Sequence, residues 1–299
     1  MIKKTLILLA LSWAGSASAQ LLYFDKGADV EWDEVTLSGT NLQKRVKTSD
    51  GRDAITSIPA AQVTRVDWPY PDELQQALVL ILQKNYGEAL KKASAVRDIH
   101  SNWKDKPGSW YYQATLYAAE CHIGKGDAAE SDKILTELRT AQLPSTYQKA
   151  LSFVQGLEEW MKKKPGPALT KLIRVLDADD SLLAARAHLL SGEIQLANQA
   201  PKEAMEAYLQ IPVFYGAQGP LMAPAELGVA KSLQALQRFP DAISALDRLI
   251  ARYKDSPEAA EATKVKAEIE SALVGGGGAR AEDKAEGTTK PEAETPADK

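Results

Sequence analysis

The sequence predicts a mainly α protein, an α-solenoid of antiparallel helix pairs preceded by a small antiparallel β module. Three observations lead to this fold class. Short runs of alternating apolar residues follow residue 20, apolar residues recur at helical spacing from residue 72 onward, and small residues within the helical part repeat at a constant spacing. With 299 residues, 44% of them hydrophobic and 25% charged, the chain is long enough to bury a substantial core.

Residues 1–19 have the pattern of a secretory signal peptide. Lys3 and Lys4 precede the apolar run 6–15, and Ala17-Ser18-Ala19 before Gln20 is typical of a cleavage site. The apolar run is shorter than the roughly 20 residues that a bilayer-spanning helix needs. We therefore expect cleavage after Ala19, export to the periplasm or outer envelope, and no stable membrane insertion afterwards.

Residues 20–68 are expected to form the β module. Apolar and polar residues alternate there, as in Val30-Glu31-Trp32 and Val35-Thr36-Leu37, which indicates strands with one buried face. Asp50-Gly51 is a strong hairpin signal, because glycine adopts the positive φ that a tight turn requires. We predict four or five short strands in an arrangement that resembles a small Sm- or SH3-like curled sheet. This module is expected to dock on the helical part through Trp68.

The segment Trp68-Pro69-Tyr70-Pro71-Asp72 marks the start of the helical domain, residues 69–274. Each proline restricts the residue before it to extended conformations, and Asp72 is suited to cap the helix that follows. We interpret the segment as a boundary plug in which Trp68 and Tyr70 bury apolar surface. An aromatic-proline motif for peptide recognition is the alternative.

The helical domain is dominated by alanine, leucine, glutamate, lysine and glutamine, which are strong helix formers. Proline and glycine interrupt it regularly, for example at Asn85-Tyr86-Gly87 and Lys164-Pro165-Gly166-Pro167. The intervals predict about eleven helices of roughly 11 to 20 residues. A string of antiparallel helices forms either a bundle or a solenoid, and only repetition favours the solenoid.

Repetition is carried by pairs of small residues twelve positions apart. From one pair to the next, the first small residue lies 42, 37, 36 and 38 residues further along the chain. Small residues at such positions let the two helices of a pair approach closely, so we assign them a packing role. The pairs are Ala77 with Ala89, Ala119 with Ser131, Gly156 with Ala168, Gly192 with Ala204, and Ala230 with Ala242.

In this spacing, about 200 residues of the chain resemble the tetratricopeptide repeat (TPR) family, whose period is 34 residues. The stretch 242–259 is similar to repeats of exported bacterial proteins of the outer-membrane assembly and Tol-Pal coordinator type. The resemblance implies a superhelix whose concave wall holds a peptide or helix of a partner protein. It therefore implies a periplasmic or cell-envelope adaptor that binds a protein partner and is not an enzyme.

The same resemblance assigns positions on the first helix of each pair to the concave wall. Trp160 is the best single anchor, because tryptophans often dominate binding energies, although it can equally pack against the next repeat. The residues expected on the wall are Gln113, Leu116, Glu120, Ile123, Phe153, Leu157, Trp160, Arg186, Leu189, Glu193, Leu196, Leu227, Lys231 and Gln234.

The sequence gives little support for catalysis or for cofactor binding. The histidines His100, His122 and His188 are scattered, Cys121 is the single cysteine, and no phosphate-binding loop or nucleophile elbow occurs. We therefore expect no catalytic residue, metal or cofactor. A formal net charge of −4 argues against nucleic acid as the partner. The alternative function is an envelope glycan- or peptidoglycan-binding protein, or a hydrolase, that uses the aromatic region 103–117; core packing is the other interpretation of those rings.

Residues 275–299 are expected to form a disordered tail. They contain no leucine, isoleucine, valine or aromatic residue and are rich in glycine, alanine, glutamate, lysine, proline and threonine. Such a segment cannot bury enough apolar surface to order itself.

Overall fold

The computed structural model describes residues 20–282, with side chains described up to residue 274. The predicted signal peptide and residues 283–299 of the predicted tail lie outside the described residues. The chain divides into two compact units. The first ends at Leu143 and the second begins at Pro144.

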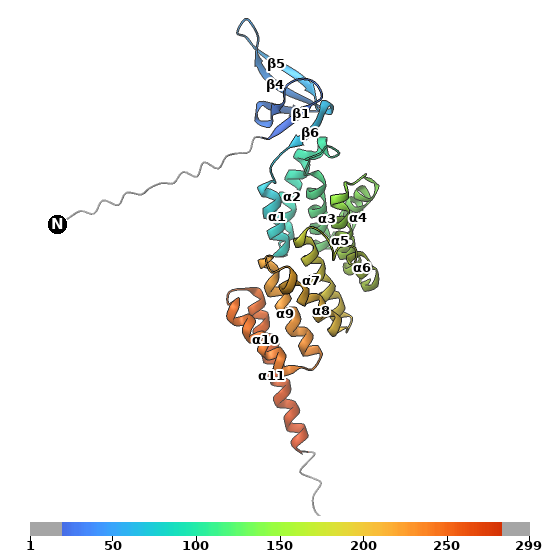
Figure 1. The fold of residues 1–299 in the computed structure, drawn as a ribbon, viewed down its shortest axis with the longest axis vertical. Helices are drawn as coiled ribbons and strands as arrows, with labels where there is room; N and C mark the ends of the chain where they lie inside the picture. Colours follow the sequence, from blue (N-terminus) through green and yellow to red (C-terminus); the bar gives the residue numbers. More distant parts are fainter. Residues whose placement is uncertain (1–19, 283–299) are drawn as a thin grey trace, which may run out of the picture. The chain divides into compact units, whose positions relative to one another are not determined.

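The first unit begins with six strands, one or two more than the sequence predicts. They form two three-stranded sheets, ordered β2-β1-β6 and β3-β4-β5, and every neighbouring pair is antiparallel (Figure 1). The strands are β1 (Leu21–Phe24), β2 (Val30–Glu31), β3 (Val35–Ser38), β4 (Asn41–Lys47), β5 (Asp53–Pro59) and β6 (Val63–Asp67).

The predicted hairpin at Asp50-Gly51 joins β4 and β5. Gly51 has φ +82°, a left-handed conformation that other residues rarely adopt. The backbone N–H of Thr48 donates to the Arg52 carbonyl at 2.9 Å and closes the turn. The turn sets the register that places Leu42 opposite Ile58, with Leu42 fully buried.

The β module shares one hydrophobic core with Trp103 of the helical part, against which Trp110 also packs. Trp68 is 6% exposed, and its ring centroid lies 5.7 Å from that of Trp103 in an edge-to-face arrangement. Trp32 completes a triad, at 5.3 Å from Trp68 and 5.4 Å from Trp103. Docking through Trp68 is therefore confirmed. Tyr70 is 42% exposed, so the expectation that it also buries its surface is wrong.

Four helices complete the first unit: α1 (Asp72–Leu82), α2 (Tyr86–His100), α3 (Tyr111–Lys125) and α4 (Ala128–Thr140), with a 3-10 turn at Ser101–Trp103. Asp72 does not cap α1 as expected, because Pro71 occupies the N-cap position and no side chain bonds to the first turn. Asp72 is instead the first helical residue, where its carboxylate faces the positive end of the helix dipole.

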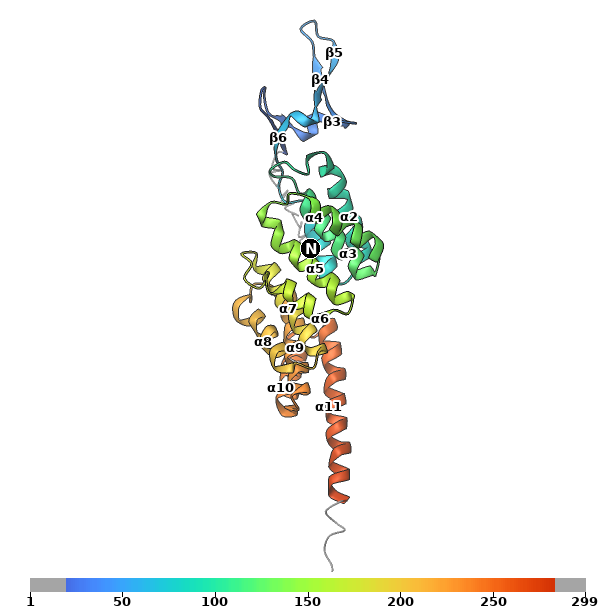
Figure 2. The same ribbon diagram turned by 90° about the vertical axis from the view of Figure 1, so that its right-hand side faces the viewer.

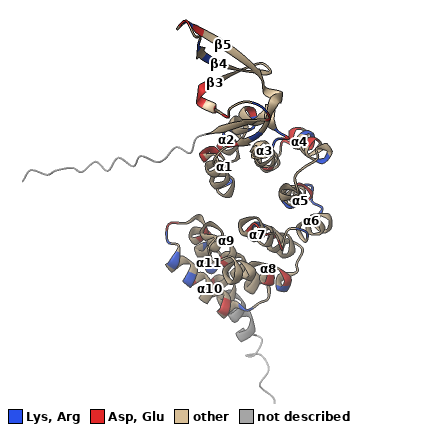
Figure 3. Ribbon diagram, turned by 45° about the horizontal axis from the view of Figure 1, so that its top comes forward, with Lys and Arg blue, Asp and Glu red and all other residues tan. Residues whose placement is uncertain are grey.

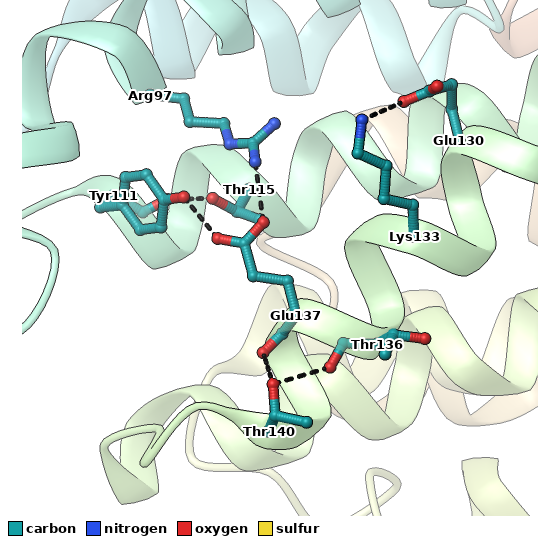
Figure 4. A network of polar contacts seen from close by, with 8 residues as sticks. All are labelled: Arg97, Tyr111, Thr115, Glu130, Lys133, Thr136, Glu137 and Thr140. Carbon is teal, nitrogen blue, oxygen red and sulfur yellow. Dashed lines mark hydrogen bonds and ion pairs between the residues drawn. The ribbon is translucent and has the colours of Figure 1, made fainter.

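A polar network ties three of these helices together (Figure 4). Arg97 of α2 forms an ion pair with Glu137 of α4 at 2.9 Å, and the Tyr111 hydroxyl of α3 donates to the other oxygen of the same carboxylate. Burial, and then the neighbouring Glu137, raise the pKa of Tyr111 above its usual value. The phenol therefore stays protonated and remains a donor.

His100 packs against the shared core and makes the stability of the fold depend on pH. Its ring centroid lies 4.1 Å from that of Trp68, and its Nδ1 accepts a hydrogen bond from the backbone N–H of Trp110 at 3.3 Å. Burial lowers the pKa of His100 from 6.5 to about 4. The ring is therefore neutral near pH 7.

We expect the free energy of unfolding to fall as the pH drops from 6.5 to 4, because the unfolded chain protonates His100 in this window and the folded chain does not. The contribution is roughly 3 kcal/mol over the full window. Urea denaturation of wild type and His100→Asn at pH 7, 5.5 and 4.5 measures it. The variant should be less stable at pH 7 but lose less on acidification, and equal losses in the two proteins would refute the assignment.

Within residues 144–282, the second unit contains seven helices (Figures 1 and 2). Two have lengths outside the predicted range, namely α6 with 8 residues and α11 with 26. The last turns of α11 continue past residue 274, where the helical domain was expected to end, and project beyond α10 in Figure 2. The helices are α5 (Ser145–Met161), α6 (Pro165–Leu172), α7 (Ser181–Ala197), α8 (Pro201–Phe214), α9 (Gly219–Ala235), α10 (Phe239–Arg252) and α11 (Pro257–Glu282).

The same turn links the two helices of each of five pairs. In every case one residue adopts the left-handed conformation, and the second helix begins two residues later. The residue after the left-handed one donates its N–H to the carbonyl five positions earlier, at 2.8 to 2.9 Å, which satisfies the free carbonyls at the helix end. The left-handed residues are Lys84, Gly126, Lys163, Gln199 and Gln237.

These left-handed residues advance along the chain by 42, 37, 36 and 38 positions, the steps taken by the predicted small-residue pairs. Each lies seven residues after the first small residue of its pair, as Lys84 does after Ala77. The backbone therefore repeats in the register that the small residues indicated. Pairs α1–α2 and α3–α4 belong to the first unit, and α5–α6, α7–α8 and α9–α10 to the second.

Candidate protein-binding face

The candidate site is a stripe along the first helices of the three pairs in the second unit, here called the first-helix face. Its positions on each helix are spaced by three or four residues and so lie on one side. On α7, for example, Leu189, Glu193 and Leu196 follow Arg186 at this spacing. The face comprises Phe153, Leu157, Trp160, Arg186, Leu189, Glu193, Leu196, Leu227, Lys231 and Gln234.

Direct contacts join the stripes of neighbouring helices. The guanidinium carbon of Arg186 on α7 lies 4.6 Å from the centroid of the Phe153 ring on α5, a cation–π arrangement. The Lys231 ammonium on α9 forms an ion pair at 3.2 Å with Glu261 on α11. Contacts therefore link the face residues of α5 and α7, and Lys231 of the face is paired with a residue of α11. Sequence reasoning missed Glu261, because α11 is not the first helix of a pair.

The predicted binding residues divide into a buried and an accessible group. Phe153, Arg186 and Leu227 are buried, so they support the face and offer little surface to a partner. Glu193 is exposed. Half-buried side chains make up the rest: Leu157, Trp160, Leu189, Leu196, Lys231 and Gln234.

Trp160 lies near the end of α5, half-buried. The Lys163 ammonium lies 5.7 Å from its ring centroid. This arrangement leaves part of an indole ring available beside a positive charge, which is typical of residues that anchor protein interfaces.

Glu120, the predicted wall residue of α3, belongs to the first unit and is buried. Its carboxylate is therefore unavailable to a partner. The other first-unit positions, Leu116 and Ile123, are buried as well, and Gln113 is half-buried. The accessible part of the predicted wall thus lies mainly in the second unit.

All ten predicted packing residues are buried. Gly156 shows the reason most directly: a Cβ added there would lie 3.0 Å from the Leu172 side chain and 3.3 Å from the carbonyl oxygen of Ala168, its partner in the small-residue pair. A larger residue would force α5 and α6 apart.

One tyrosine packs between three helices. The Tyr208 ring of α8 is buried, and a Cβ added to Gly192 of α7 or to Gly228 of α9 would lie 2.7 or 2.5 Å from it. Burial, and then the charge of Glu193, raise the pKa of Tyr208. Sequence reasoning identified Gly192 as a small residue but missed Gly228, because it lies outside the twelve-residue spacing.

The aromatic region 103–117 does not form a sugar-binding platform. Trp103, Tyr111, Tyr112 and Tyr117 are buried in the first unit, and Trp110 donates its Nε1 hydrogen to the Trp68 carbonyl at 3.1 Å. Buried rings offer no face on which a sugar can stack. The alternative function based on these residues is therefore not favoured, and the rings are core residues.

The described residues contain no candidate metal site. Among them, no three histidine, cysteine, aspartate or glutamate side chains lie close enough together to hold an ion. Cys121 is buried in α3. Within residues 20–282, no helix combines the length and apolar composition that crossing a bilayer requires.

Several solved structures are similar to this chain at low sequence identity. The crystal structure of a Rap protein complexed with competence and sporulation factor matches with a TM-score of 0.52 at 13% identity over 68% of this chain, which spans 60% of the Rap protein. MamA protein matches with a TM-score of 0.38 at 13% identity, over 62% of this chain and 97% of MamA. None of the curated protein sequences matches.

A third similar structure is a Podospora anserina putative kinesin light chain with nearly identical TPR-like repeats. It matches with a TM-score of 0.41 at 14% identity, over 60% of this chain and 92% of the other. Among family models, the tetratricopeptide repeat matches residues 154–220 and 228–273, which span the pairs of the second unit. This match shows tetratricopeptide repeats within residues 154–273, and the same turn recurs in the helix pairs of the first unit.

Proposed function

We propose that this protein is a non-enzymatic adaptor of the bacterial cell envelope that binds a partner protein through the first-helix face. The observation that carries the proposal is the face itself. Half-buried aliphatic side chains, an indole ring and charges of both signs lie along the first helices of three consecutive repeat pairs. Repeat proteins of this kind use such extended surfaces to hold peptides or helices.

The composition of the face favours a protein partner over a phosphate-bearing one. Lysine and arginine occur alongside aspartate and glutamate on the helices of the second unit, rather than as a basic block (Figure 3). Glu193 and Lys231 place opposite charges among leucines. A mixed surface of this kind is typical of protein interfaces, whereas nucleic-acid sites concentrate positive charge.

The envelope location rests on the sequence of residues 1–19, which has the basic start, apolar run and cleavage site of an export signal. The similarity of residues 242–259 to repeats of exported outer-membrane assembly and Tol-Pal coordinator proteins supports the same location. Fractionation of cells that express the full chain tests it, with N-terminal sequencing of the exported form expected to begin at Gln20.

Affinity capture from envelope extract tests the binding function. We expect a partner protein to be retained by the wild type and retained less by Trp160→Ala and by Lys231→Glu, because both substitutions alter accessible side chains of the face. Phe214→Ala is the matched control, since Phe214 is an exposed ring at the end of α8, outside the face. Equal retention by all four proteins would refute the proposed face.

A further inference from the structure

A pocket with a volume of about 620 Å³ lies in the first unit, and none of its lining residues belongs to the first-helix face. The segment between β6 and α1 and the last turns of α2 line it, together with Trp32. The volume is within the range of sites that hold small molecules or short peptide segments, roughly 300 to 1,000 Å³.

The apolar lining of the pocket is both accessible and fixed in place. Tyr70 is 42% and Ile99 48% exposed, so both side chains are accessible to a ligand. The Tyr70 ring packs edge-on against Trp110, with centroids 5.0 Å apart, so its position is set by the core. Pro69 and Pro71 restrict the backbone on either side of Tyr70. A ligand therefore meets a preformed surface.

The charge of the pocket is negative. Asp72 and Glu73 line it, and neither carboxylate forms a hydrogen bond or ion pair that would neutralise it within residues 20–274. No lysine or arginine is among the lining residues. His100 adds no positive charge near pH 7, because burial lowers its pKa to about 4. This electrostatic arrangement opposes phosphates and carboxylates and attracts a cation.

The apolar lining distinguishes an arginine side chain from a simple metal ion. Trp68, Tyr70 and Ile99 line the pocket, together with Pro69 and Pro71. The aliphatic stem of an arginine packs on such side chains while its charged head stays near the carboxylates, and a bare ion has no stem.

We propose that this pocket binds a short peptide segment that carries an arginine. The arginine stem packs on Tyr70 and Ile99, and the guanidinium faces Asp72 and Glu73. Arginine fits better than lysine because its planar, weakly hydrated group combines stacking on rings with paired hydrogen bonds to carboxylates. The proposal does not depend on the first-helix face. It assigns to residues 68–73 a recognition role in addition to their boundary role.

Titration of the full chain with acetyl-Leu-Arg-Leu-amide tests the proposal, with the tryptophan indole N–H signals followed by NMR. We expect saturable shifts, and binding weakened about tenfold or more when citrulline replaces arginine, because citrulline keeps the shape and loses the charge. Glu73→Gln should lower the affinity for the arginine peptide to the affinity that the wild type has for the citrulline peptide. Glu130→Gln, which removes an exposed carboxylate on α4, should leave binding unchanged.

Several outcomes would overturn the proposal. They are no saturable binding of the arginine peptide up to about 10 mM, equal affinity for the citrulline peptide, or an unchanged affinity in Glu73→Gln. Stronger binding of acetyl-Leu-Glu-Leu-amide would show that the electrostatic argument is wrong. Stronger binding of a chito-oligosaccharide would identify the rings as a glycan site instead. Circular dichroism of each variant establishes that it is folded.

Discussion

The Gly228→Ala variant is expected to lose about 2 to 3 kcal/mol of unfolding free energy, the cost of overpacking a tight core. The added Cβ would lie 2.5 Å from the Tyr208 ring, closer than real Cβ contacts. Tyr208 cannot move aside, because Gly192 of α7 holds the other contact with the same ring. Either the ring or α9 must shift.

The sign of this effect is diagnostic. Helix propensity alone predicts that Gly→Ala in a helix interior stabilises by up to about 1 kcal/mol, whereas the packing of α8 against α9 predicts a net loss. Gly87→Ala is the control, because Gly87 lies in α2 and a Cβ there meets nothing within 4 Å. We expect Gly87→Ala to be neutral or stabilising in urea denaturation.

A double-mutant cycle with Tyr208→Leu separates the contact from general damage to α9. The smaller side chain leaves room for the added methyl group, so Gly228→Ala should cost much less in the Tyr208→Leu background. Stabilisation of the wild type by Gly228→Ala, or full additivity in the cycle, would contradict the packing described here.

The Trp103→Ala variant is expected to lose about 3 to 5 kcal/mol, because Trp103 is fully buried and contacts both Trp32 and Trp68. Its ring joins the β module to the helices of the first unit. Hydrogen exchange should show loss of protection in β1, β6 and the end of α2, since β1 and β6 contribute to the core that holds Trp103, and His100 of α2 packs on Trp68.

Trp103→Phe is the matched variant. It keeps an aromatic ring and removes an indole N–H that has no acceptor among the described residues, so it should cost far less than Trp103→Ala. If Trp103→Ala leaves protection in the strands unchanged, the β module is stable without the shared core, and the docking interpretation is wrong.

The repeat pattern could be predicted from the sequence because it depends on residue size. Ala77 and Ala230 lie where helices touch, and a chain cannot place larger residues there without separating the helices. The left-handed backbone conformation within each turn was harder to predict. Four of the five left-handed positions are lysine or glutamine, as at Lys84 and Gln237, and these residues carry no turn signal.

The exposure of the proposed binding residues could not be predicted from the sequence. The Arg186 guanidinium lies over the Phe153 ring, so each side chain covers the other and both are buried. Helical periodicity gives the direction of a side chain and not whether a neighbour covers it. For the same reason Tyr70, which composition suggested as a buried ring, is exposed beside a pocket.

Site-specific photo-crosslinking is the most direct test of the proposed binding face. A photoreactive phenylalanine analogue is placed at Trp160 or Leu189 on the face, and at Ile173 or Phe214, which are exposed outside it. After irradiation of intact cells, we expect a protein adduct from the two face positions and none from the two control positions. Adducts of equal yield at all four positions, or adducts from the control positions alone, would contradict it.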